Sequence, residues 1–173
     1  MRNRAYILLV VVVLLLQITV LNNLAITPLV APTIYILVLL FLPIEKPQWQ
    51  MLGIGLLLGL FMDITMGTAG LNVIVTLPVA YFRRMLLFSL TGLSTLSTEE
   101  GTPTVKRLGT RFHNYAIAVI LLHSLLFYSV EWLSLQNLGF LSLRILCSSV
   151  VSLILDYTII LLFSKRLSAG QTR

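Results

Sequence analysis

Long apolar stretches alternate with short polar stretches along almost the whole chain. A helix needs roughly 20 apolar residues to cross the hydrocarbon core of a bilayer, and the apolar stretches approach or reach this length. The pattern therefore predicts one all-α membrane domain covering residues 1–173, a bundle of six transmembrane helices. The predicted spans are about 5–21, 26–44, 51–66, 68–84, 115–133 and 138–163.

The first apolar stretch, 5–21, follows Arg2 and Arg4, a pattern that signal peptides share. It is longer than the usual apolar core of a signal peptide, and Asn22 and Asn23 follow it where a cleavage site has small residues. We therefore interpret it as the first membrane helix.

The fourth predicted span, 68–84, is short for a bilayer. We expect either a nearly upright helix in a thinned bilayer, or Arg83 and Arg84 extending to the membrane surface while residues 85–90 lie along it. The polar stretch 91–114 is expected to form the one large cytoplasmic loop, with some disorder.

Basic residues set the predicted orientation. The chain has 12 Lys and Arg against 6 Asp and Glu, and Lys and Arg accumulate in the cytoplasmic loops of membrane proteins. With both termini in the cytoplasm, the three outward loops contain no basic residue, and Arg144 is the one exception near the outer side. A five-helix alternative would place Lys106, Arg107 and Arg111 outside, so six spans are favoured.

These basic residues flank apolar stretches and are not interleaved with exposed aromatic side chains, so no nucleic-acid partner is expected. Anionic lipids at the cytoplasmic face are the expected partners of this charge.

Gly55, Gly59 and Asp63 recur every four residues and share one face of the third predicted helix. Small residues let another helix approach closely, and a carboxyl group can hydrogen-bond across the contact. Together with Gly67 and Gly70 in the following turn, this face is a site either of packing inside the bundle or of contact with a partner or ligand. The residues do not decide between them.

Four further polar residues in predicted spans form two candidate pairs. His123 and Asp156 both lie about 12 to 14 Å from the cytoplasmic surface at about 1.5 Å per residue, so we expect them to pair. Glu131 and Arg144 lie near the outer ends of two neighbouring helices, and an ion pair is expected there. Structural pairing is favoured over a proton relay.

Enzymatic function is weakly supported by this sequence. Asp63 and Asp156 are the two aspartates an intramembrane hydrolase would need, but their depths differ, at about 18 and about 12 Å. No nucleotide-binding, serine-hydrolase or histidine-rich metal motif is present, and the single Cys147 lies in an apolar stretch. We therefore expect a non-enzymatic protein without catalytic residues, cofactor or metal.

Four stretches resemble the MreD family of rod shape-determining proteins in order and spacing. They are APTIYILVLLFLPIEKP at 31–47, GIGLLLGLFMDI at 53–64, GTAGLN at 67–72 and AYFR at 80–83. The resemblance covers about a third of the chain. It implies a six-helix fold similar to the substrate-binding component of energy-coupling-factor transporters.

The same resemblance implies a membrane component of the bacterial elongation complex, which controls cell shape and peptidoglycan synthesis. Its implied partners are an MreC-like bitopic protein, the MreB filament, and a RodA-type glycan polymerase with its transpeptidase. The alternative is the membrane component of a vitamin or small-molecule transporter. Short, mostly apolar outward loops count against it, because such a component needs polar groups and a covering loop there.

Overall fold

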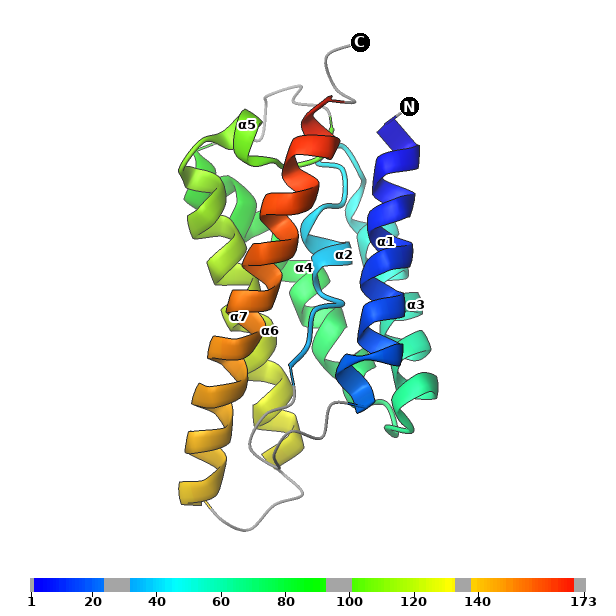
Figure 1. Ribbon diagram of the computed structural model, residues 1–173, viewed down its shortest axis with the longest axis vertical. Coiled ribbons are helices and arrows are strands. Elements are labelled where there is room, and N and C mark those ends of the chain that lie inside the picture. The colour runs from blue at the N-terminus through cyan, green and yellow to red at the C-terminus, as the bar shows by residue number, and fades with distance from the viewer. Residues whose placement is uncertain (1, 24–31, 93–100, 133–137, 170–173) are drawn as a thin grey trace.

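The computed structural model describes residues 2–23, 32–92, 101–132 and 138–169, and this part of the chain is helical with connecting turns (Figure 1). Five helices are long, and two are single turns. The helices are α1 (Arg2–Thr19), α2 (Leu37–Leu40), α3 (Gln48–Met66), α4 (Leu71–Thr91), α5 (Val105–Leu108), α6 (Arg111–Trp132) and α7 (Leu138–Ala169), with a 3₁₀ turn η1 (Leu21–Asn23) after α1.

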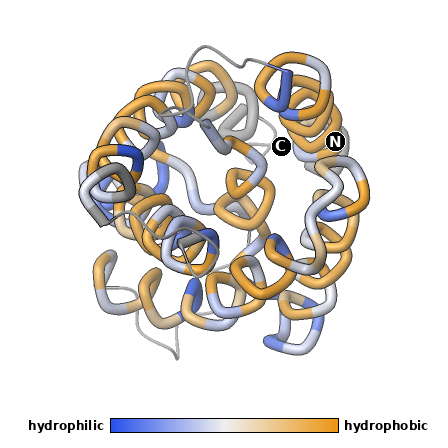
Figure 2. Tube along the Cα trace, turned by 90° about the horizontal axis from the view of Figure 1, so that it is seen from below, coloured by the Kyte–Doolittle hydropathy of each residue, from blue (hydrophilic) through white to orange (hydrophobic). Residues whose placement is uncertain are grey.

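The five long helices surround the centre of the molecule. α3 packs on α4, α4 on α6, α6 on α7 and α7 on α1, while α2 lies between them and contacts α1 and α3 (Figures 1 and 2). The beginning of α1 and the end of α7 lie at the same end of the bundle.

The distribution of polar and apolar side chains suits a membrane rather than water. In the described residues, five helices are long and apolar enough to cross a bilayer: α1, α3, α4, α6 and α7. Large apolar side chains such as Ile64 and Leu57 are 81% and 69% exposed on the outside, whereas Asn72, His123 and Asp156 are fully buried. The chain therefore has the architecture of an all-α membrane-embedded protein.

The prediction of a continuous second helix over residues 26–44 is wrong. Of its described residues, 32–44, only the four residues of α2 form an α-helix, and the preceding residues enter the bundle as extended chain and turn. Thr33 to Leu42 are all buried. Irregular backbone is tolerated at membrane depth only where protein encloses it, and here the five long helices do so.

The fourth span also differs from its prediction. α4 continues past Arg84 to Thr91 and ends at Gly92, whose φ of 70° suits glycine. Residues 85–90 are therefore helical and do not form a separate segment along the surface. Arg83 is fully buried in the bundle, so the expectation that it extends to the membrane surface is wrong.

The predicted cytoplasmic loop is shorter and better packed than expected in its described part. α6 begins at Arg111 rather than near 115. Residues 101–104 are buried, and the backbone N–H of Ile44 donates to the carbonyl of Gly101 over 2.9 Å. This contact joins the loop to the C-terminal end of the central segment, residues 32–44.

Candidate functional site

The glycine face of α3 packs inside the molecule, against α4. A Cβ added to Gly55 would lie 2.9 Å from the Cβ of Ala80, and one added to Gly59 would lie 2.7 Å from the Cα of Val73. Both distances are shorter than a carbon–carbon contact allows. Of the two interpretations left open by the sequence, the structure therefore selects close packing within the bundle.

Replacing Gly59 with alanine is expected to destabilise the protein by about 1–3 kcal/mol, the usual cost of forcing a methyl group into a packed core. The clash is with the backbone of α4, so no side-chain rotation relieves it. Gly53 is the matched control, because an added Cβ there meets nothing within 4 Å, and alanine favours the helix by up to about 1 kcal/mol. The free energies of unfolding in detergent, measured by SDS titration, should change in opposite directions.

Gly67 and Gly70 form the turn between α3 and α4 rather than a packing face. Their φ angles are 66° and 88°, and an added Cβ would meet nothing within 4 Å at either position. Both glycines are therefore needed for the backbone conformation of the turn, because residues with a side chain rarely adopt positive φ. The turn brings Asp63, near the end of α3, next to the first residues of α4.

Asp63 caps the N-terminus of α4. Its Oδ1 accepts from the backbone N–H of Asn72 at 2.9 Å, and its Oδ2 accepts from the backbone N–H of Val73 at 3.1 Å. Thr68 adds its hydroxyl at 2.5 Å and the Asn72 side-chain amide donates at 3.1 Å. These backbone donors have no partner within the helix, and a negative charge is favourable at this end. Asp63 therefore faces the bundle interior.

A chain of hydrogen bonds continues from Asp63 across the bundle. Because the Asn72 Nδ2 faces the carboxylate, its Oδ1 faces Tyr35 and accepts from the phenol at 2.9 Å. The Tyr35 oxygen lies 2.8 Å from His123 Nε2. Since the phenolic proton is already donated to Asn72, His123 Nε2 must carry the proton in this contact. The chain thus places a proton on His123 Nε2 and joins α3, α4, the central segment and α6.

Two side chains hold the extended part of the central segment. Gln17 on α1 accepts from the backbone N–H of Ile34 at 2.7 Å and donates to the carbonyl of Pro32 at 3.3 Å. On the opposite side, Ser152 on α7 accepts from the backbone N–H of Thr33 at 3.0 Å. These bonds satisfy backbone groups that a helix would have paired, which is what an apolar environment requires.

Arg83 caps the other end of the segment. Its guanidinium donates to the carbonyls of Leu40 and Leu42, and the Tyr6 hydroxyl of α1 donates to the carbonyl of Val38 at 2.9 Å. In the part of the chain that the structure describes, Arg83 has no carboxylate partner. A cation is favourable beside the unpaired carbonyls at the end of a helix, so the short α2 and the buried charge stabilise each other.

The two predicted polar pairs have different outcomes. Arg144 Nη2 lies 2.9 Å from Glu131 Oε1, so the expected ion pair forms. His123 bonds to Tyr35, while neither carboxylate oxygen of Asp156 has a hydrogen-bond partner among the described residues, so the pair His123–Asp156 does not form.

The register of α6 and α7 explains the missing pair. The ring of His113 lies 5.5 Å from that of Tyr157, and Glu131 pairs with Arg144. Between these two contacts, His123 lies opposite the stretch around residue 150, about 9 Å along α7 from Asp156 at about 1.5 Å per residue. Equal depths estimated from helix ends were misleading, because α7 continues to Ala169, well past the level at which α6 begins beside Tyr157.

Sequence reasoning missed most of the polar contacts. The expected pairs involved ionisable side chains, whereas the observed contacts also use uncharged polar side chains within the apolar stretches. These are Gln17, Tyr35, Asn72, Thr76 and Ser152. A glutamine or asparagine inside an apolar stretch was the available signal, because such groups need a partner in a membrane.

The polar side chains described above hydrogen-bond to backbone groups of the bundle and to one another, which fixes their orientation. Among the described residues, no group of three or more His, Cys, Asp or Glu could hold a metal ion. The carboxyl groups of Asp63 and Asp156 do not hydrogen-bond to each other. Comparison with protein-family models, with curated proteins and with solved structures gives no match to this chain.

Proposed function

We propose that this chain is a multi-pass protein of the bacterial inner membrane and a non-enzymatic scaffold of the cell-elongation complex, of the MreD type. One observation carries the proposal. The four stretches that resemble that family contribute Tyr35, Gly59, Asp63, Asn72 and Arg83, and these are residues that join α3, α4 and the central segment. The resemblance thus falls on one interlocking unit rather than on scattered positions.

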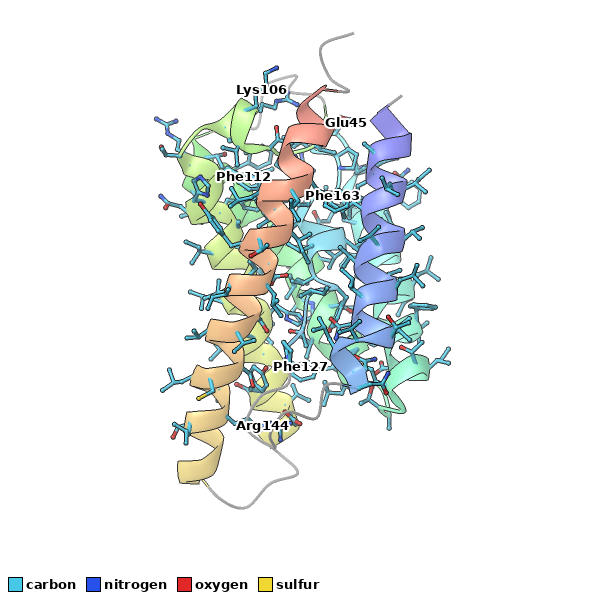
Figure 3. All side chains as sticks on the ribbon, in the orientation of Figure 1. Glu45, Lys106, Phe112, Phe127, Arg144 and Phe163 are labelled. Atoms are coloured by element: carbon cyan, nitrogen blue, oxygen red, sulfur yellow. The ribbon has the colours of Figure 1, made fainter. Side chains whose placement is uncertain are left out.

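The arrangement supports six passes with both termini in the cytoplasm. The central segment lies among the five long helices and would make the sixth crossing as a broken span. Lys106 and Glu45 lie at the end of the bundle where α7 ends, while Arg144 lies toward the other (Figure 3). An excess of basic residues at the first end is the expected mark of the cytoplasmic side, where anionic lipids are proposed partners.

A scaffold needs lateral surfaces, and the outer faces of the helices supply them. The glycine face is occupied by α4, so a partner helix would meet exposed apolar side chains instead. On α3 these are Leu56, Leu57, Leu60, Phe61 and Ile64. The proposed partners are an MreC-like bitopic protein and, directly or through it, the MreB filament and a RodA-type polymerase with its transpeptidase.

Depletion of the protein in its host, followed by microscopy, tests the proposal. We expect rod cells to round up, and an MreC-like protein to co-purify with the tagged chain in mild detergent. Complementation by Gly53→Leu, which faces open space, should restore rod shape, whereas Gly59→Leu should fail. Unchanged cell shape on depletion together with no co-purified MreC-like protein would contradict the proposal.

A transporter component is the second candidate, and the central segment favours it. Discontinuous helices near the middle of a membrane often form substrate sites in transporters. Native mass spectrometry of the gently purified protein separates the two candidates. A stoichiometric small molecule without an MreC-like protein would support transport.

A further inference from the structure

The buried face of α7 is unusually polar for a membrane helix. It is formed by Ser148, Ser149, Ser152, Asp156 and Ile160. Since Ser152 accepts a hydrogen bond from Thr33, this face points toward the central segment. Asp156 follows Ser152 by one helical turn on the same face and is fully buried.

Asp156 differs sharply from Asp63, the other aspartate of the bundle. Asp63 accepts four hydrogen bonds from Thr68, Asn72 and Val73. For Asp156, neither oxygen has a hydrogen-bond partner within the described residues. A buried carboxyl group without donors requires an explanation, because almost all buried polar groups are satisfied.

The titratable side chains on the elements packed against α7 make their hydrogen bonds and ring contacts with residues other than Asp156. Tyr6 of α1 donates to the carbonyl of Val38, Tyr115 of α6 to that of Leu40, and Tyr35 of the central segment to Asn72. On α6, Arg111 donates to the carbonyl of Thr91, the ring of His113 contacts Tyr157, His123 bonds to Tyr35, Tyr128 hydrogen-bonds to Ser148, and Glu131 pairs with Arg144. Lys106 and Arg107 belong to α5, outside the buried face.

A charged carboxylate in such a position is costly, because the interior of a membrane bundle offers neither water nor, here, a donor. A metal cation would need several oxygen ligands, and the described residues contain no cluster of metal-binding side chains. A proton needs no further ligand. We propose that Asp156 is a proton-binding site in the bundle interior and that it packs against the central segment as a neutral carboxylic acid.

The bound proton then has a structural consequence. Ser152 holds the backbone of the central segment, and Asp156 continues the same face toward the C-terminal end of α7. Removing the proton would place a negative charge on the face of α7 that holds the irregular backbone at Thr33. Close packing of α7 on the central segment therefore requires the protonated acid, whichever partners the protein has.

Infrared difference spectroscopy tests this directly. Spectra of the wild type and of Asp156→Asn, both in lipid at neutral pH, are subtracted. We expect the difference to show the C=O stretch of a protonated carboxyl group, which shifts on exchange into D₂O. Glu45→Gln is the matched control, because Glu45 is exposed, and its difference should show carboxylate bands instead. Carboxylate bands for Asp156 would overturn the proposal.

Two further measurements separate a bound proton from its alternatives. Replacing choline chloride with sodium chloride should leave the Asp156 band unchanged, whereas its conversion into carboxylate bands would identify a cation site and overturn the proposal. Asp156→Leu should unfold at a temperature no lower than the wild type. A large drop would reveal a lost ion pair or donor, and would equally contradict a neutral, unpartnered acid.

Discussion

Replacing Asp63 with alanine is expected to lower the free energy of unfolding by about 3–5 kcal/mol. Loss of a helix cap costs about 1 kcal/mol, and hydrogen bonds to a charged group contribute about 1.5–3 kcal/mol each, although such contributions are not additive. The carboxylate accepts from two backbone N–H groups of α4, at Asn72 and Val73, and from two side chains. In the variant the two backbone N–H groups and the Thr68 hydroxyl lose this acceptor, whereas the Asn72 side-chain amide still donates to Thr68.

SDS titration followed by circular dichroism in detergent measures this change. Thr65→Ala is the matched control, because Thr65 lies on the exposed side of the same turn and bonds only to the carbonyl of Met62. Its effect should stay within about 0.5 kcal/mol, as for most surface substitutions. Equal stability of Asp63→Ala and Thr65→Ala would contradict the role of Asp63 as the cap of α4.

Arg83→Met is expected to cost a similar amount, about 2–5 kcal/mol. The carbonyl of Leu42 loses its donor in a buried environment, which costs about 1–3 kcal/mol, and the carbonyl of Leu40 keeps only the Tyr115 hydroxyl in place of two donors. Methionine fills much of the same volume, so the effect reports the lost hydrogen bonds more than a cavity. Because the guanidinium closes α2, the central segment should loosen first.

Arg84→Met provides the control, since Arg84 is exposed and adjacent in sequence. Hydrogen exchange by mass spectrometry should show faster exchange of residues 37–44 in Arg83→Met and no change there in Arg84→Met. If both variants exchange like the wild type and unfold at the same SDS concentration, then Arg83 does not stabilise α2.

Both predictions concern the same structural principle. In each case a charged side chain from a neighbouring helix closes one helix end inside the bundle: Asp63 at the start of α4 and Arg83 at the end of α2. In a membrane these groups have no water to replace a lost partner. The two charges therefore stabilise the fold directly, which explains why Asp63 and Arg83 face the interior of the bundle.

Hydrophobic length and charge distribution alone predicted the all-helical membrane character and the presence of the five long helices, although not their exact ends. They also predicted the ion pair between Glu131 and Arg144, since residues next to one short connection have few other partners. Such properties depend on residues close together in sequence, and the apolar solvent requires helices whatever their neighbours are.

Tertiary structure decided the rest. An apolar composition cannot distinguish a lipid-facing helix from a broken segment enclosed by other helices, so residues 32–44 were predicted as part of a continuous helix over 26–44. The partners of Arg83 and His123 depend on helix rotation and register, which set whether a side chain meets lipid, a carbonyl or another ring. Those quantities arise only when five helices pack around the central segment, because each polar group finds its partner on a different part of the chain.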